Sequence, residues 1–588
     1  MSAYPHLLAP ITLRGLEIRN RLFSSGHVPG YTPEGLPNDR YIAYNAEKAK
    51  GGIGMIVFGG STNIARDSIS IFGGLSIRDD AAIPAYRRLA DAVHAEGAAI
   101  LCQITHMGRH CRWDAGEWLP LMGPSPVRDP GGGRALPREM DQADFARAIE
   151  DYAEGARRCA EAGLDGVEVI ASMHLPGQFF SPLANRRTDG YGGSLENRTR
   201  FLREVLEACR ARVPDSFIVG VRFTADESNE GGIPAVEGVE IGAILGRHGA
   251  ADFLNVNGAY SGTAQGVNRA FPGMEAKSAP YIELARRVRE ASGLITMQAS
   301  RLDTLGTADY AIASGCLDMA GMTRPHMADP HIIAKLRRGE EHRIRPCVGA
   351  GYCLDRPYRG LDALCLHNPS TSRELTLPHE TEPAERSKRA LVVGGGPAGL
   401  EAARVLAERG HEVRLSEATD RLGGQLALAA RGGWRRGLAG VIDWLAAELD
   451  HLGVTVELNR FVEAEDIIAA KAELVILATG GLPLCDLPEG GADLALTAWE
   501  VLGEGRQPAG GAAGKPLEPG DRDEGGGRRH ARPGGAARRR PGGGACAWCP
   551  QRRCPRPRRP GRRRSPAGGS QSRRRLPSVP HRRCPHVA

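Results

Sequence analysis

Four polar side chains lie within or just beyond short apolar runs that are far apart in the chain: Gln103, Arg222, Arg301 and Arg324. A bound flavin needs a hydrogen-bonding partner for its pyrimidine edge, a positive charge near N1 and C2=O, and cations or backbone amides for its phosphate. Gln103 can supply the first and Arg222 the second, and Arg301 and Arg324 can bind the phosphate. The sequence therefore predicts a flavin site assembled from distant segments.

The elements that must bring these side chains together are eight short β-type runs, which are separated by longer helical patterns. The runs cover residues 21–25, 55–59, 99–104, 166–170, 218–223, 253–256, 295–298 and 319–322. Strands that alternate with helices form a parallel sheet, and eight such units in about 300 residues predict an α/β fold of the (β/α)8 TIM-barrel type. In that fold the chemistry lies where the strands end.

Three cysteines follow the predicted barrel on a glycine-containing loop: Cys347, Cys353 and Cys365. Their spacing is close to the C-x2-C-x2-C and distant C pattern of a [4Fe–4S] cluster, but Ala350 stands at the second position. Three thiolates leave open a cluster with a non-cysteine or open fourth position, a three-iron cluster, or an ordered loop of inert thiols. We expect a cluster. Two side chains nearby are candidates for the fourth ligand: Asp355 and His367.

A second nucleotide-binding pattern begins at residue 390, after a polar linker. The run 390–393 leads into Gly394-x-Gly396-x-x-Gly399, and Glu417 follows at the end of a second predicted strand. Such glycines let the backbone approach a pyrophosphate, and the acid accepts hydrogen bonds from an adenosine ribose. The pattern predicts a Rossmann-like domain that binds FAD or ADP.

The predicted organisation has four parts: a barrel over 1–345, an iron–sulfur loop and linker over 346–389, an incomplete Rossmann-like domain over 390–504, and a basic tail over 505–588. The tail carries a net charge of +18, from 21 Arg, one Lys and four acids, whereas the whole chain carries +7. It holds too few aliphatic residues to offset its chain entropy, so we expect it to be disordered. Its composition is typical of GC-rich DNA read in a shifted frame.

Composition also limits the partners. The sequence has no run of the roughly 18 apolar residues that a membrane span needs, and no signal-peptide pattern. The cysteines before the tail show no secreted-type framework. We expect a cytoplasmic protein with a small-molecule substrate and no membrane or specific nucleic-acid partner, and a homo-oligomer remains open.

Three longer motifs give the chain a specific resemblance: QITHMGR at 103–109, SPLANRRTDGYGGSLENR at 181–198 and GMTRPHMADP at 321–330. With these motifs the chain resembles the Old Yellow Enzyme-related NADH:flavin oxidoreductases, in the group that includes trimethylamine dehydrogenase and 2,4-dienoyl-CoA reductase. Within that group, the segments 39–52 and 347–353 are most similar to N-methylproline demethylases.

The resemblance implies FMN in the barrel, with Gln103, Arg222, Arg301 and Arg324 as its ligands. It also implies that the FMN is not attached covalently, because Val28 stands where trimethylamine dehydrogenase has its attaching cysteine.

The same resemblance bears on the reaction. His174 lies where relatives place a substrate-contacting His or Tyr, and His27 is a second candidate for a catalytic role. Reductases of the group protonate their substrate from a nearby Tyr, which the stretch 171–177 lacks, whereas amine oxidation needs only a neutral amine held over the flavin. The resemblance thus implies oxidative demethylation of a small N-methyl amine or imino acid, with electrons leaving through the cluster to an electron-transfer protein.

Two alternatives remain at this stage. One is NAD(P)H-dependent reduction of an activated alkene, such as an enoyl-CoA or an enone. The other, from a different class, is an inactive product whose tail binds polyanions without specificity.

Overall fold

The structure is a computed structural model, and the residues that it describes are 3–69, 73–111, 119–131, 135–483 and 496–504. The chain divides into two units, 1–511 and 512–588. The second unit and the predicted tail, 505–588, lie outside the described residues, so the prediction for the tail is not tested. None of the described helices combines the length and apolarity that a membrane crossing requires.

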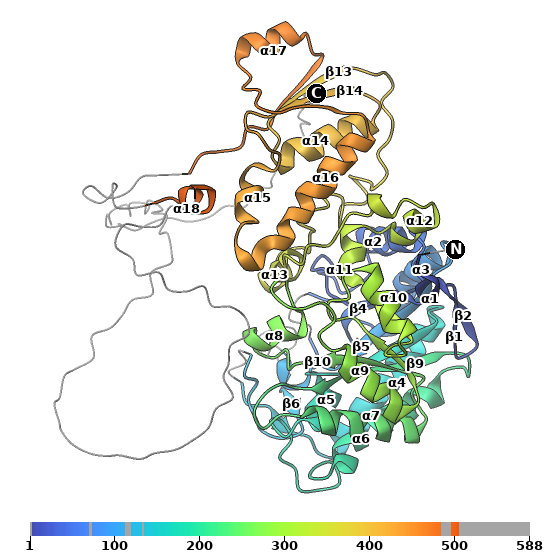
Figure 1. Ribbon diagram of the computed structural model, residues 1–588. Helices are drawn as coiled ribbons and strands as arrows, with labels where there is room; N and C mark the ends of the chain where they lie inside the picture. The colour runs from blue at the N-terminus through green and yellow to red at the C-terminus, as the bar shows by residue number, and fades with distance from the viewer. Residues whose placement is uncertain (1–2, 70–72, 112–118, 132–134, 484–495, 505–588) are drawn as a thin grey trace, which may run out of the picture. The chain divides into compact units, whose positions relative to one another are not determined.

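Eight parallel strands close into a barrel in the first part of the chain (Figure 1). In chain order they are β3 (Leu22–Ser24), β4 (Met55–Asn63), β5 (Ala99–Thr105), β8 (Gly166–Ala171), β9 (Ile218–Asp226), β10 (Phe253–Gly258), β11 (Ile295–Gln298) and β12 (Met319–Gly321). Each strand pairs with the next, and β12 returns to pair with β3. Every predicted strand overlaps one of these eight, so the predicted TIM barrel is confirmed.

Helices cover the outside of the barrel, and local sequence signals set where several of them begin. The long ones are α2 (Asp39–Lys50), α3 (Ile83–His94), α4 (Gln142–Glu161), α6 (Leu195–Arg212), α7 (Ala235–His248), α9 (Ile282–Ser292) and α10 (Leu305–Ala313). Asp141 and Asp144 form a reciprocal capping box at the start of α4, and the Ser194 hydroxyl accepts the Asn197 amide at the start of α6.

Shorter elements occupy the loops and ends of the barrel. They are α1 (Pro5–Leu8), β1 (Ile11–Leu13), β2 (Leu16–Ile18), β6 (Met122–Gly123), β7 (Arg138–Glu139), α5 (Leu175–Phe180), α8 (Ala264–Ala270), α11 (Thr323–Ala328), α12 (Ile332–Arg337) and α13 (Tyr352–Tyr358). The antiparallel pair of β1 and β2 contributes Leu13 and Ile18 to a cluster inside the barrel.

Two layers of apolar side chains hold the barrel together. Alternate strand residues such as Val57, Leu101 and Phe253 form the inner cluster, and their neighbours pack outward against the helices. Gly220 makes room for the inner layer, since a Cβ at this position would lie 2.0 Å from the Phe253 ring. Apolar side chains therefore fill the end of the barrel opposite the strand C-termini.

The second domain is a four-stranded parallel sheet in the order β15-β14-β13-β16, with helices packed on it. Its elements are β13 (Arg389–Val393), α14 (Pro397–Glu408), β14 (Glu412–Ser416), α15 (Gly424–Ala429), α16 (Ala439–His451), β15 (Thr455–Glu457), α17 (Ala464–Ala470) and β16 (Leu474–Leu477). A further helix, α18, spans Ala498–Glu504. This strand and helix order confirms the predicted Rossmann-like domain. At the β16 edge the side chain of Leu477 is 68% exposed.

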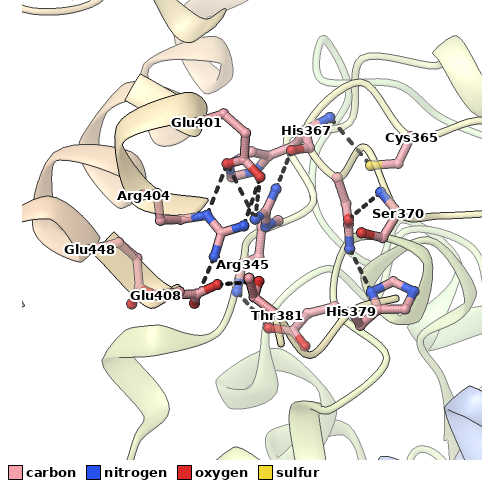
Figure 2. A network of polar contacts seen from close by, with 12 residues as sticks. Arg345, Cys365, His367, Ser370, His379, Thr381, Glu401, Arg404, Glu408 and Glu448 are labelled. Atoms are coloured by element: carbon pink, nitrogen blue, oxygen red, sulfur yellow. Dashed lines mark hydrogen bonds and ion pairs between the residues drawn. The ribbon is translucent and has the colours of Figure 1, made fainter. Parts of the chain in front are cut away.

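A buried polar network joins the segment that leaves the barrel to α14 of the second domain (Figure 2). Arg345, which is 6% exposed, donates to Glu401 at 3.2 Å and to the carbonyl oxygen of His367 at 2.5 Å. Glu401 also pairs with Arg404 at 2.8 Å, and Arg404 pairs with Glu408 at 2.7 Å. Arg345 is thus held between a helix of the second domain and the loop that carries Cys365.

Helix α16 adds an aromatic face to this network. The guanidinium of Arg345 lies 4.3 Å from the centre of the Trp444 ring, and the His367 ring meets the same Trp444 edge-on at 5.1 Å. Arg343 pairs with Glu448 of α16 at 2.8 Å. Removal of Arg345 would therefore leave Glu401 with Arg404 as its remaining cation among the described residues.

We predict that Arg345→Leu lowers the free energy of unfolding by about 3 kcal/mol, because it leaves Glu401 buried with one cation fewer. The matched control is Arg338→Leu, since Arg338 forms an exposed pair with Glu340 at 2.8 Å and should contribute less than about 1 kcal/mol. Urea titrations of the three proteins, followed by circular dichroism, measure the difference. Equal losses in the two variants would contradict a structural role for the network.

Candidate active site

A large cavity of about 1640 Å³ opens at the C-terminal ends of the barrel strands. Its lining includes six side chains that the sequence singled out: Gln103, Arg222, Arg301, Arg324, His27 and His174. Of the three cysteines, Cys353 lines the same cavity, next to Ala350. The structure therefore brings together residues that lie up to about 300 positions apart, as a closed parallel barrel requires.

The orientation of Gln103, at the end of β5, is fixed by a buried carboxylate. Its Nε2 donates to Glu168 of β8, and Asn255 of β10 donates to the other Glu168 oxygen at 2.8 Å. The Gln103 carbonyl oxygen is left to face Gly26, where an added Cβ would lie 2.6 Å from it. Gln103 thus presents an acceptor to the cavity, which suits the N3–H of a flavin ring.

Arg222, within β9, supplies a half-buried positive charge to the cavity lining. Its guanidinium donates to the Ser25 hydroxyl, burial lowers its pKa, and Glu168 opposes that shift. Burial likewise raises the pKa of Glu168, and Arg222 opposes that shift in turn. The two charges therefore stabilise each other behind the cavity wall. Sequence reasoning missed Glu168, although a carboxylate inside an apolar strand was a signal that could have found it.

Arg301 and Arg324 follow β11 and β12, the usual position of a phosphate site in this fold. Arg301 adopts a left-handed backbone with φ of +52°, and its guanidinium donates to the Gly273 carbonyl. Arg324 donates to the carbonyl oxygen of Pro272 at 2.8 Å. Both guanidinium groups therefore converge on the same loop above the cavity. Together with Gln103 and Arg222, the donor and acceptor set fits a flavin with one phosphate.

The two predicted catalytic histidines differ in how their rings are engaged. Both ring nitrogens of His27 have partners, because Nδ1 donates to the Ser25 carbonyl at 3.0 Å and Nε2 accepts the Tyr44 hydroxyl at 2.8 Å. His174 follows β8, and its Nδ1 bonds to the Thr105 hydroxyl at 2.5 Å, which leaves Nε2 for the cavity. Burial lowers the pKa of each histidine to about 3, so both are neutral near pH 7.

A further histidine in the lining, His110, was not singled out from the sequence. It ends a short 3-10 helix (Gly108–His110) after β5, and its Nδ1 bonds to Asp129 at 2.5 Å. Asp129 comes from a loop that the strand pattern did not place near the barrel mouth. No local spacing connects the two, so sequence reasoning had no means of pairing them.

The three cysteines are free thiols on the loop beyond the barrel. Burial raises the pKa of each, to about 12 for Cys353, and the Cys347 thiol contributes to the rise in both others. The Cys365 sulfur accepts the backbone amide of His367 at 3.4 Å. In the described part of the chain, no three His, Cys, Asp or Glu side chains gather closely enough to hold a metal ion.

The candidates for a fourth cluster ligand have other partners. Asp355 pairs with Arg359 along α13 at 2.8 Å, where both side chains are exposed. The His367 ring donates from Nδ1 to the Pro346 carbonyl at 3.1 Å and packs on Trp444. Neither observation supports them as ligands.

In the second domain, the glycine motif has the geometry that close backbone approach requires. Gly394 has φ of +107°, and a Cβ at Gly399 would lie 1.9 Å from the Gly394 carbonyl oxygen. Nothing lies within 4 Å of a Cβ built on Gly396, so a ligand can come close there. Glu417 stands at the end of β14 and accepts the Gly395 amide at 2.6 Å. The motif therefore suits a pyrophosphate, as predicted.

Comparison with protein families gives two matches. Residues 6–343 match the NADH:flavin oxidoreductase / NADH oxidase family. Residues 392–446 match an NAD(P)-binding Rossmann-like domain.

Three similar proteins cover most of the chain. A probable N-methylproline demethylase of Rhizobium meliloti is 45% identical over 85% of this chain and 74% of its own length. A multifunctional alkene reductase/demethylase of Caballeronia cordobensis is 44% identical over 85% of this chain and 72% of its own. An N,N-dimethylglycine/sarcosine dehydrogenase of Chromohalobacter salexigens is 42% identical over 86% of this chain and 74% of its own.

We predict that Glu168→Gln weakens FMN binding about tenfold, because a neutral amide can donate as well as accept and no longer fixes the Gln103 carbonyl. The flavin potential should also rise, since Arg222 loses its counter-charge. The control is Glu227→Gln, a second buried glutamate, which accepts from Ser181 and Ile233. Flavin fluorescence on dilution and a redox titration measure the two effects. Unchanged affinity and potential would contradict the role of Glu168.

Proposed function

The chain belongs to the NADH:flavin oxidoreductase / NADH oxidase family and is a flavin-dependent oxidoreductase, and on this premise we propose that it oxidises an N-methyl group of a small amine or imino acid. Two relatives that are named for demethylation and one that is named for dimethylglycine and sarcosine support this substrate class. The observation that carries the proposal is the neutral state of His174, which lines the cavity at the end of β8. A reductase would need a proton-donating acid at this place.

We propose FMN as the cofactor in the barrel, where it would accept a hydride at N5. The Gln103 carbonyl would bind the pyrimidine edge, Arg222 would place positive charge beside it, and Arg301 and Arg324 would hold the phosphate. Val28 lines the cavity at the position where a covalently attached flavin would need a cysteine, so the flavin would be held by these contacts alone.

His174 would contact the substrate from the cavity wall. Its Thr105 hydrogen bond fixes the ring, and its free Nε2 can accept or donate a hydrogen bond to the amine or to a carboxylate. We do not assign a proton-accepting role to His27, because Ser25 and Tyr44 engage both of its ring nitrogens. The amine must be neutral before its C–H bond can lose a hydride. Loss of the hydride leaves an iminium, which water hydrolyses to formaldehyde and the demethylated amine.

Alkene reduction finds less support in the site. It would need a side chain that protonates carbon, and the stretch 171–177 has no tyrosine. Tyr260 lies near the cavity, but burial raises its pKa to about 12, and its hydroxyl accepts from Arg109 at 3.2 Å. One relative is named as an alkene reductase as well as a demethylase, so alkene reduction is the second candidate function.

We further propose that Cys347, Cys353 and Cys365 hold an iron–sulfur cluster, which would pass single electrons to a carrier protein. The electrostatic influence of the Cys347 thiol on Cys353 and Cys365 and the amide hydrogen bond to Cys365 support this. Burial raises the pKa of both Cys347 and Cys353, and the positive charge of Arg324 opposes that rise. In the second domain, the 394–399 glycine motif and Glu417 would bind FAD or ADP.

N-Methylproline should bleach the oxidised-flavin absorbance of the FMN-loaded protein under anaerobic conditions and release one formaldehyde for each flavin reduced. Proline is the matched control, because it has the same ring and carboxylate but no N-methyl group, and it should leave the absorbance unchanged. Bleaching by NADPH with turnover of a conjugated enone, and none by N-methylproline, would instead establish alkene reduction.

Replacement of Ala350 tests the cluster site. We expect Ala350→Cys to raise the iron and acid-labile sulfide of anaerobically purified protein towards four of each per chain, because it completes a four-cysteine set. The control is Gly339→Cys, which adds a thiol outside the loop and should change neither content. Equal iron in wild type and Ala350→Cys, at less than one per chain, would show that the loop holds no cluster.

A further inference from the structure

The proton of the substrate ammonium needs an acceptor that His174 does not supply. Burial lowers the pKa of His174 to about 3, and the nearby charges of His110, Arg222 and His106 lower it further. A protonated His174 would therefore sit among cations in a buried wall. His106 is also engaged, since Nε2 bonds to Asp67 at 3.1 Å and Nδ1 accepts the Gly108 amide at 3.1 Å.

His110 differs from these histidines because it lines the cavity together with its carboxylate partner, Asp129. Its Nδ1 donates to Asp129 at 2.5 Å, and the second Asp129 oxygen accepts the Gly131 amide at 2.9 Å. Both side chains are nearly buried, with 3% of His110 and 10% of Asp129 exposed. Burial opposes ionisation of Asp129, but the hydrogen bond and charge of His110 lower its pKa below the usual value.

This arrangement leaves a lone pair on His110 Nε2. The donor hydrogen bond to Asp129 places the proton on Nδ1, so Nε2 is an acceptor. Its one contact among the described residues is a long one of 3.5 Å to the Tyr260 hydroxyl. The Tyr260 hydroxyl is itself positioned by Arg109 Nη2 at 3.2 Å. An imidazole with a carboxylate behind it and an open nitrogen in front is the arrangement of a general base.

The turn that carries His110 is clamped to the turn that carries His174. Gln178 of α5 donates to the carbonyl oxygens of Met107 and Met173 at 2.9 and 3.0 Å and accepts the Arg109 amide at 3.2 Å. Gly108 in this turn has φ of +57°, and an added Cβ would lie 2.5 Å from Gln178. The two histidines are therefore held in fixed relation on one wall of the cavity.

We propose that His110 is the catalytic base that takes the proton from the substrate ammonium, with Asp129 as the positioning residue that stabilises the resulting imidazolium. This inference rests on the proposed oxidation of an N-methyl amine. The N–H bond of the ammonium breaks, its electron pair stays on nitrogen, and the proton goes to His110 Nε2. The neutral amine then loses a hydride from its methyl group to the flavin and becomes the iminium.

The surroundings of His110 support this direction of transfer. Asp129 and Tyr260 contact the His110 ring, and His174 interacts with it electrostatically. Four further charged or titratable groups surround these neighbours: Arg109 and Glu227 beside Tyr260, and His106 and Arg222 beside His174. Asp129 is the only one of these that bonds to the ring directly through a carboxylate. The proton can therefore be stabilised at His110 Nε2, whereas the hydrogen-bonded partner of His174 is the neutral Thr105 hydroxyl and both ring nitrogens of His106 are already engaged.

The test compares anaerobic flavin reduction by N-methylproline in wild type, His110→Asn and Asp129→Asn across pH. At pH 7 we expect His110→Asn to reduce its flavin at least 100-fold more slowly, within the range that general bases contribute. The difference should shrink as the pH approaches the amine pKa of about 10, because the substrate then arrives already neutral. The rate of flavin reduction in Asp129→Asn should lie between the rates of wild type and His110→Asn. If a substitution slowed the reaction by disturbing the structure instead, the slower rate would persist at all pH values.

Two further measurements keep the result interpretable. The Nδ1 proton of His110 should give a downfield nuclear magnetic resonance signal in the FMN-loaded protein, which both variants lose whether or not they turn over. His94→Asn is the matched control, because His94 pairs with Asp165 at 2.9 Å on the barrel exterior, and it should behave as wild type in the kinetic assay.

The outcomes separate the two proposals. No reduction of wild type by N-methylproline overturns the proposed function and the role of His110 with it. If N-methylproline reduces the wild type and His110→Asn at the same rate, the role of His110 alone is overturned. The same holds if His110→Asn is slower but high pH does not restore its rate.

Discussion

Closure of eight parallel strands is the constraint on which the site depends. A parallel strand can pair on both sides only if its neighbours run the same way, so every strand ends at the same mouth of the barrel. Gln103, Arg222 and Arg324 come from three different strand ends and meet there for that reason. The apolar inner layer, in which Phe253 fills the space left by Gly220, closes the other end and keeps the chemistry at one face.

Polar side chains line the mouth of the barrel, and pairing between opposite charges keeps these side chains ordered. Glu168 and Arg222 lie in adjacent strands, and each would be destabilised by burial without the other. The same carboxylate also decides which atom Gln103 presents to the cavity. Asp129 likewise orients the His110 ring. Gln103 and His110 are thus each oriented by a carboxylate behind them, whereas His174 is held by the neutral Thr105 hydroxyl.

The loop beyond the barrel depends on the second domain as well. Arg345 binds Glu401 of α14 and the His367 carbonyl at once, and His367 in turn donates its amide to the Cys365 sulfur (Figure 2). The conformation of the cysteine loop is therefore coupled to the packing of the Rossmann-like domain. β16 is one of the two edge strands of that sheet, and its Leu477 is exposed there.

The sequence by itself determined the eight strands, the Rossmann-like pattern and the residues that meet at the cavity, because period, spacing and glycine geometry are local properties that neighbours in the chain express directly. Only the tertiary structure decided how those residues work. It turned the Gln103 carbonyl inward through Glu168, engaged both nitrogens of His27, and paired His110 with Asp129 across 19 residues of chain. Hydrogen-bond partners and burial set the charge and orientation of a side chain, and both arise from contacts between segments that the sequence leaves unspecified.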